Sequence, residues 1–233
     1  MDISYDVHGQ RYTGYLAQPS SREKVPGILV FHGGGGLGAH VRERADRLAQ
    51  LGYVAFAPDL FGHPVSGVDH AKKITHELTQ NWSELRLRCS IALELLRRQS
   101  NVDADRVAAI GFCFGGQVAL ELGRSGADVR AIVGFHSQLK TPRPEDSVHI
   151  KAKVLVFLGD KDCFVSAEER EAFLKNMTGS GVDCQMLLFS GVHHSFTDRH
   201  AEASGVPDLK YDAVADRRSW AAMQTLFTEA FAQ

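Results

Sequence analysis

The sequence predicts a single-domain α/β protein whose mainly parallel sheet is covered by helices on both faces. Short runs rich in β-branched and aromatic residues alternate with longer amphipathic segments, a pattern typical of such sheets. At 233 residues the chain is long enough for one large domain with a full core. We see no repeat, low-complexity tract or linker in it, so we expect one domain over residues 1–233.

The expected strands are short. Residues 3–7 and 12–18 alternate apolar and polar side chains, which predicts an antiparallel edge. The later strands are almost wholly apolar, as in a parallel sheet buried on both faces, and are expected at 27–31, 53–58, 107–112, 129–135, 154–158 and 185–189.

Helices are expected between these strands, at 42–51, 114–123, 168–176 and 212–231. The longest helical region, 70–99, spaces its apolar side chains by three and four residues, and these are Leu78, Trp82, Leu85, Cys89, Leu93 and Leu96. The polar segment between 135 and 151 is too short to hold a large lid domain.

Composition excludes several classes of function. A net charge of -2, with no basic run beyond two residues, argues against nucleic-acid binding. No apolar stretch approaches the roughly 20 residues that span a bilayer, and the first ten residues do not resemble a signal peptide. Four cysteines without C-x-x-C spacing predict free thiols in a reducing cytoplasm. The sequence is compatible with either a monomer or a dimer.

The strongest functional signal is Gly111-Phe-Cys-Phe-Gly-Gly116, which lies between an expected strand and an expected helix. A G-x-nucleophile-x-G turn lifts its central side chain onto a sharp corner, the arrangement of α/β-hydrolases. Cys113 would then lie at a helix N-terminus, where the helix dipole favours a thiolate, and the N–H of Phe114 would face a developing oxyanion. The flanking glycines disfavour the alternative, a small packing residue in a βα turn.

The other three cysteines are weaker candidates. Cys89 lies on the apolar stripe of its helix and Cys184 begins a strand, so both are expected to pack. Cys163 follows a candidate acid and is expected to be structural, although solvent is able to reach it.

A thiol nucleophile needs a base and a residue that orients the base. In α/β-hydrolases the acid follows one later strand and the histidine the next. Here the first loop offers Asp160 or Asp162, and the second offers His193 or His194. The chain order fits, but spacing alone leaves both choices open.

Three segments, Gly-Phe-Cys-Phe-Gly-Gly, Gly-Asp-Lys-Asp-Cys-Phe-Val and His-His-Ser-Phe, resemble those of the dienelactone hydrolase (carboxymethylenebutenolidase) family. The similarity extends over nearly the whole chain, including residues 52–62. It implies an α/β-hydrolase fold without a large lid domain. It also implies that Asp162 is the acid and His194 the base, with Asp160 and His193 as the weaker alternatives.

The chain departs from this family at one loop. The family carries a glutamate that pairs with the thiol, and its position falls near Gly33, within His32-Gly-Gly-Gly-Gly36, where no carboxylate is available. The tetraglycine instead resembles the HGGG-type loop of esterases, which donates a second oxyanion N–H. We expect Gly34 to be that donor; the alternative is a flexible loop without substrate contact.

The substrate-binding residues expected are Gly33, Trp82, His136 and Arg199. Family members that cleave carboxylated dienelactones use two arginines. One of these positions is occupied here by His70, Lys72 and Lys73, and the other is displaced by about one residue to Arg199. A bidentate grip on a carboxylate would not survive this change unaltered.

The predicted function is hydrolysis of a small-molecule ester or lactone by Cys113, His194 and Asp162 through a thioester. No metal or organic cofactor is expected, because the two adjacent histidines do not have ligand spacing. Two alternatives stay open. The same residues would serve a thioesterase or an aryl-phosphotriesterase, and the fold would also suit a non-catalytic ligand-binding protein.

Overall fold

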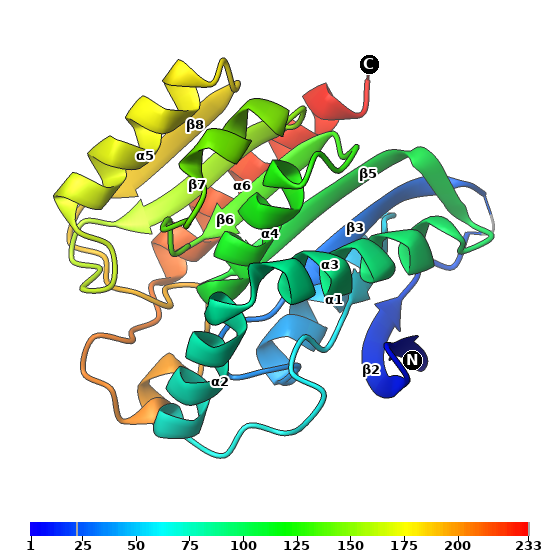
Figure 1. Ribbon diagram of the computed structural model, residues 1–233, viewed down its shortest axis with the longest axis horizontal. Helices are drawn as coiled ribbons and strands as arrows, with labels where there is room; N and C mark the ends of the chain where they lie inside the picture. The colour runs from blue at the N-terminus through cyan, green and yellow to red at the C-terminus, as the bar shows by residue number, and fades with distance from the viewer. Residues whose placement is uncertain (22, 233) are drawn as a thin grey trace.

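The computed structural model describes residues 1–21 and 23–232, which form an eight-stranded sheet between two layers of helices (Figure 1). The strand order is β1-β2-β4-β3-β5-β6-β7-β8, and every neighbouring pair from β4 through β8 is parallel. The strands are β1 (Asp2–Val7), β2 (Gln10–Ala17), β3 (Val25–Phe31), β4 (Val54–Ala57), β5 (Val102–Phe112), β6 (Ala131–Phe135), β7 (Lys153–Gly159) and β8 (Cys184–Phe189).

The first two strands form the antiparallel edge that their alternating pattern predicts. β1 pairs with β2, and β2 then pairs antiparallel with β4. Strands β3 to β7 are mostly buried on both faces, whereas the edge strand β8 is partly exposed, and alternate side chains of the buried strands enter two separate cores. Leu29 and Phe31 face one core, whereas Ile28 and Val30 face the other. The predicted α/β fold is therefore confirmed.

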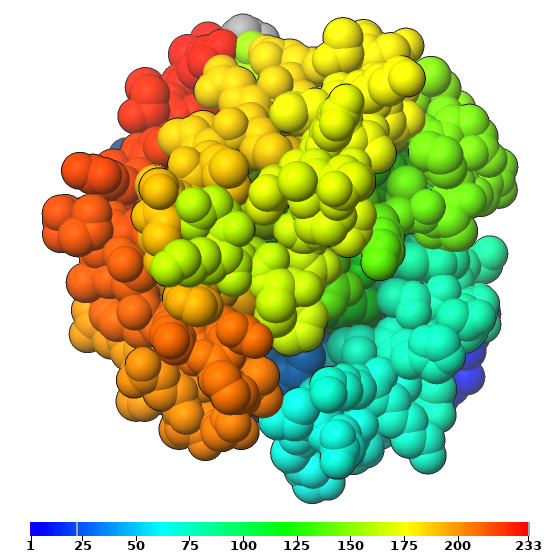
Figure 2. All heavy atoms as spheres, turned by 90° about the vertical axis from the view of Figure 1, so that its left-hand side faces the viewer, coloured from blue at the N-terminus to red at the C-terminus, as the bar shows by residue number. Residues whose placement is uncertain are grey.

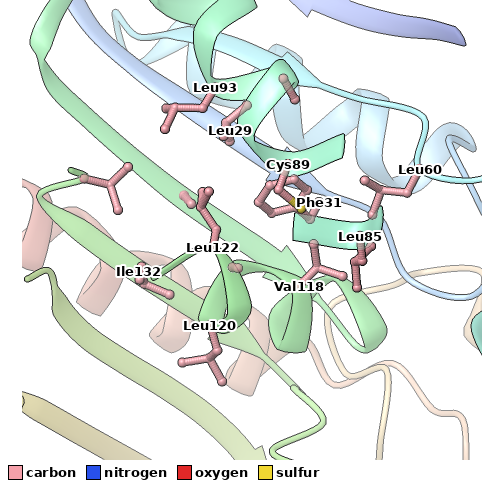
Figure 3. Close-up of a cluster of buried hydrophobic side chains, with 14 of the residues drawn as sticks. Leu29, Phe31, Leu60, Leu85, Cys89, Leu93, Val118, Leu120, Leu122 and Ile132 are labelled. Atoms are coloured by element: carbon pink, nitrogen blue, oxygen red, sulfur yellow. The ribbon is translucent and has the colours of Figure 1, made fainter. Parts of the chain in front are cut away.

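The helices divide between the two faces. α1 and α6 cover one face, and α2 to α5 cover the other (Figure 1). Figure 3 shows Leu85 and Cys89 of α3 and Val118 of α4 packed near Phe31. The helices are α1 (Ala39–Gln50), α2 (Val68–Gln80), α3 (Trp82–Arg97), α4 (Phe114–Arg124), α5 (Ala167–Gly179) and α6 (Ala213–Ala230). None of the helices within the described residues is long and apolar enough to cross a membrane.

Two expectations about elements need correction, and two short 3₁₀ helices were not expected. The long helical region is two helices, because Asn81 leaves helical geometry and its side chain caps α3 by accepting from the N–H of Glu84. β5 begins at Val102, five residues before the expected start. The prediction missed these residues because several of them carry charged side chains that are partly or fully exposed, which breaks the apolar pattern of a buried strand. The polar segment after β6 contains a 3₁₀ helix, η1 (Pro144–His149); a second, η2 (Ala201–Ser204), precedes α6.

Candidate active site

Cys113 occupies the sharp corner between β5 and α4. Its backbone has φ 56° and ψ -119°, which few non-glycine residues adopt and which turns the side chain out of the sheet. Three backbone hydrogen bonds hold the corner: the N–H of Cys113 donates to Phe135, and its carbonyl accepts from Gly116 and Gln138. The cysteine residue as a whole is half-buried.

The glycines beside Cys113 are required by close backbone contacts. A Cβ on Gly111 would lie 1.9 Å from the carbonyl oxygen of Gly115, and one on Gly115 would lie 2.2 Å from that of Phe31. Neither contact is possible without moving the backbone. The G-x-C-x-G spacing therefore reflects the packing of the corner itself.

Two backbone N–H groups converge on the sulfur. Burial alone raises the pKa of the Cys113 thiol, but His194 and the N–H groups of Phe114 and Gly34 together hold that pKa below its ordinary value. Phe114 begins α4, so the positive end of the helix also faces the sulfur. Donors arranged in this way stabilise negative charge at or beside the sulfur.

His194 and Asp162 meet at the carboxyl edge of the sheet. The Nδ1 atom of His194 lies 2.7 Å from Oδ2 of Asp162, whose other oxygen accepts from the N–H of Phe164. Burial lowers the pKa of His194, but the neighbouring Cys113 and Asp162 outweigh it and raise the pKa to about 10. Nε2 of His194 makes no well-aligned hydrogen bond to the described residues, yet it lies close enough to the Cys113 thiol for each group to shift the other's pKa.

Asp160 and His193, the alternatives to Asp162 and His194, have other partners. Asp160 is exposed and accepts a hydrogen bond from the N–H of Gly191. Nδ1 of His193 lies 3.7 Å from Oδ1 of Asp208. The structure therefore brings together Cys113, His194 and Asp162, not the alternative pair.

The four expected substrate-binding residues have different surroundings. A Cβ on Gly33 would lie 3.2 Å from Cβ of Cys113, so this position directly faces that cysteine. His136 is buried, with its ring centroid 5.0 Å from that of His194. Trp82 packs half-buried against the core, and Arg199 is exposed above the ring of Tyr211. Only Gly33 and His136 are thus placed next to the three central side chains.

Small, uncharged side chains of α2 face the glycine loop. A Cβ on Gly34 would lie 3.5 Å from that of Ala71 and 4.0 Å from Cγ2 of Thr75. Lys72 and Lys73 are exposed instead, while His70 contacts Ser66. The cationic side chains considered for α2 therefore do not face the loop.

Sequence reasoning missed Phe164, which contacts His194, and Thr197 and His40, which lie behind it at His136. Phe164 is 40% exposed, and its ring centroid lies 4.7 Å from that of His194. Thr197 is fully buried, and its hydroxyl lies within hydrogen-bond distance of His136 and His40. Thr197 directly follows the His-Ser-Phe segment, and this proximity was the only signal available for it.

Figure 2 faces the carboxyl edge of the sheet, where α2 (cyan), the segment around η2 (orange) and the loop after β7 (yellow-green) surround a recess. Two surface cavities of about 340 Å³ lie elsewhere, one lined by Asp128 and Lys151 and the other by Tyr12 and Glu77. Neither contains the three central residues. Across residues 1–21 and 23–232, no group of three or more His, Cys, Asp or Glu side chains is arranged to hold a metal ion.

A parallel sheet of this order, with a strained residue at the turn from a central strand to a helix, defines the α/β-hydrolase fold. The profile of the dienelactone hydrolase family matches residues 12–231. The chain therefore belongs to the dienelactone hydrolase family, a family of hydrolases, as the three motifs predicted.

Individual relatives agree with this assignment. A putative carboxymethylenebutenolidase of Aquifex aeolicus is 30% identical over 206 residues, which cover 86% of this chain and 88% of the relative. A solved structure named m3DLH is 40% identical, with a TM-score of 0.94 over 99% of this chain and 97% of its own. A dienelactone hydrolase-like promiscuous phosphotriesterase from metagenomic libraries is 37% identical, with a TM-score of 0.93 and the same coverage.

Proposed function

We propose that this protein hydrolyses neutral carboxylic esters or lactones through a thioester on Cys113. The observation that supports this most strongly is that three groups act on one sulfur, namely the imidazole of His194 and the N–H groups of Phe114 and Gly34, while Asp162 holds that imidazole from its other side. This arrangement favours the thiolate by lowering the pKa of the thiol, and it provides a base and oxyanion donors at the same point.

In the first half-reaction, the Cys113 thiolate attacks the carbonyl carbon, and the C=O electron pair moves onto oxygen. The N–H groups of Phe114 and Gly34 bind this oxyanion. When the tetrahedral intermediate collapses, the bond to the alkoxy oxygen breaks. His194, held by Asp162, gives its Nε2 proton to the departing alkoxide, which leaves a thioester on Cys113.

In the second half-reaction, His194 acts as a general base. It takes a proton from water while the water oxygen attacks the thioester carbonyl. Collapse of the second intermediate releases the carboxylic acid and restores the Cys113 thiolate beside protonated His194. No additional reactant is needed, so the cycle is a balanced hydrolysis.

The proposed substrate is neutral because none of the cationic side chains expected to hold a carboxylate, all of them described residues, faces the glycine loop or Cys113. Ala71 and Thr75 face the glycine loop, Lys72 and Lys73 are exposed, and Arg199 lies over Tyr211. We expect a neutral ester or lactone to be cleaved with a higher kcat/KM than its carboxylated counterpart. Equal or better cleavage of the carboxylated compound would contradict this part of the proposal.

The decisive experiment is intact-mass analysis after brief exposure to p-nitrophenyl acetate, with peptide mapping of the adduct. We expect one acetyl group on Cys113 in the parent protein and none there in Cys113→Ala. Cys163→Ala is the matched control, because Cys163 is the exposed cysteine of the chain and should be dispensable. Full ester hydrolysis by Cys113→Ala would overturn the proposal.

A second candidate activity is hydrolysis of aryl phosphotriesters by the same residues. It is favoured by the 37% identical neighbour whose name describes a promiscuous phosphotriesterase. The side chains nearest Gly34 are small, which leaves room for a tetrahedral phosphorus centre. A panel of esters, lactones, thioesters and paraoxon separates the options by kcat/KM. A non-catalytic ligand-binding role would be indicated if Cys113→Ala matched the parent throughout.

A further inference from the structure

A second histidine contacts the proposed general base from the protein interior. His136 immediately follows β6 and is 2% exposed. Its ring lies edge-on to that of His194, with centroids 5.0 Å apart and an interplanar angle of 66°. Phe196 packs edge-on against the same His136 ring, at 5.1 Å and 85°. The imidazole of His194 therefore rests against a buried aromatic ring.

His136 is held rigidly in this place. Its Nε2 lies 2.8 Å from Oγ1 of Thr197, and its backbone N–H donates to Phe157 at 2.8 Å. Thr197 is itself fixed, because its carbonyl accepts from Arg44, which forms a buried double ion pair with Asp216. The ring of His136 thus has little freedom to move away from His194.

The backbone around the site is strained at the same points. Among the described residues, four non-glycine residues have positive φ, and three of them are Cys113 (56°), His136 (39°) and Ser195 (60°). Cys113 is the proposed nucleophile, and Ser195 directly follows His194. Unfavourable backbone geometry persists where the surroundings enforce it, often at functional sites. The strained turn at His136 directs its side chain toward His194.

His136 is a neutral neighbour of a charged imidazole. Burial, together with the nearby charges of His194 and Arg44, holds the pKa of His136 well below its ordinary value. The acidic groups around this cluster are Asp162, which is bonded to His194, Asp216, which is paired with Arg44, and Asp198, whose charge acts on His40. On the outer side, Phe164 contacts His194 but is 40% exposed, so this outer ring is less constrained than the inner one.

We propose that His136, anchored by Thr197, is a positioning residue whose neutral ring keeps the His194 imidazole aligned with both Asp162 and Cys113. This inference rests on the proposed function, because it assigns His136 to the same thiol–imidazole pair. Without the ring, His194 has space to rotate away from the sulfur while it stays bonded to Asp162.

The test combines two readouts on purified variants whose fold is checked by circular dichroism. The first is the pH dependence of Cys113 alkylation by iodoacetamide, followed by peptide mass, which reports the ionisation of the thiol without any substrate. The second is kcat and KM for p-nitrophenyl acetate. The variants are His136→Ala, His136→Phe, Thr197→Val and Thr197→Ser. Val133→Ala, a core truncation in the same strand β6, is the control for lost packing.

We expect His136→Ala to raise the apparent pKa of Cys113 alkylation by about one unit and to lower kcat at least about tenfold, with KM changed less than about threefold. His136→Phe keeps an aromatic ring, so its alkylation pKa and its kcat should change less than those of His136→Ala. Thr197→Val should follow His136→Ala in direction, and Thr197→Ser, which keeps the hydroxyl, should restore the parent behaviour.

The proposal is overturned if His136→Ala keeps the parent alkylation profile and kcat, or if Val133→Ala shifts the profile equally. Failure of the proposed function is a separate result, seen as undiminished esterase activity in Cys113→Ala. In that case the alkylation profiles of the His136 variants still decide whether this residue sets the thiol–imidazole pair.

Discussion

At the scale of single residues, the candidate site depends on which of two neighbouring side chains turns inward. Asp162 accepts one hydrogen bond from Phe164 and one from His194, and its side chain is fully shielded from solvent. Asp160, two residues earlier, is exposed. Motif spacing alone cannot separate these residues, because the direction of each side chain is set by how the loop packs on its neighbours.

Asp162→Asn should lower kcat by roughly 10²–10⁴-fold, because an amide favours the wrong imidazole tautomer and no longer balances the charge on His194. The matched control is Asp160→Asn, in which the amide oxygen is still able to accept from Gly191. We expect its kcat to remain within about twofold of the parent. Steady-state kinetics with one ester measure kcat for both variants. Equal losses of kcat in the two would contradict the assignment of Asp162 as the partner of His194.

The pKa shifts also predict a bell-shaped pH profile of kcat/KM. The pKa of the Cys113 thiol lies below the ordinary pKa of a cysteine. Activity should therefore persist at pH values below that ordinary pKa and decline only when acid protonates the thiolate. The pKa of His194 is raised to about 10, so the alkaline limb should appear near that pH as the imidazolium is lost. The two limbs belong to the coupled pair. An alkaline limb near pH 6.5–7 would contradict the predicted shift.

At the scale of elements, the site lies where several loops meet at the carboxyl ends of the strands. Fully buried His32 anchors the glycine loop: its Nε2 accepts from the N–H of Leu60, and its Nδ1 lies 2.8 Å from the carbonyl oxygen of Gly33. This pairing corresponds to a neutral imidazole with its proton on Nδ1. The tetraglycine is thus held from one side, which favours a fixed donor over a flexible loop.

Gly34 offers a test that separates its N–H from its small size. Gly34→Pro removes the N–H and should lower kcat by about 10²–10³-fold, the usual effect of losing an oxyanion donor. Gly34→Ala keeps the N–H, and its Cβ would meet Ala71 and Thr75 at ordinary contact distances. We expect Gly34→Ala to retain kcat within about threefold. Comparable losses in both variants would indicate a steric effect and would exclude Gly34 as the donor.

The elements themselves were largely predictable, and the errors have identifiable physical causes. The buried parallel strands were found because their apolar runs are continuous. β5 was placed too short because Asp103, Asp105 and Arg106 interrupt its pattern. The break at Asn81 went unnoticed because the apolar spacing continues across it, although Asn followed by Glu three residues later is a recognisable N-cap. His40 gave no signal, and Thr197 gave only its place directly after the His-Ser-Phe segment, because their contacts with each other and with His136 depend on tertiary packing.

At the scale of the whole molecule, one buried ion pair joins the beginning and the end of the chain. Arg44 of α1 and Asp216 of α6 are both almost fully buried and share two hydrogen bonds of 2.9 and 3.0 Å. Arg44 also donates to the carbonyl of Thr197, in the loop that carries His194. The position of His194 is therefore tied to the packing of both helices on this face.

Arg44→Met should destabilise the protein by about 3–5 kcal/mol, because it leaves the carboxylate of Asp216 buried without its cation. The double variant Arg44→Met with Asp216→Leu removes both charges and should recover part of this loss. Urea unfolding followed by fluorescence measures the free energies of unfolding. If the free energy of unfolding of Arg44→Met lay within about 1 kcal/mol of the parent's, the ion pair would contribute little to stability.

The connection from β6 to β7 has a consequence for the thioester that we propose. This connection contains only η1 and short turns, and the recess seen in Figure 2 opens directly to solvent. An acyl group on Cys113 would then be exposed to whichever nucleophile is abundant. In mixtures of water and a small alcohol, a share of the acyl groups would pass to the alcohol, so the same site would synthesise new esters as well as hydrolyse them.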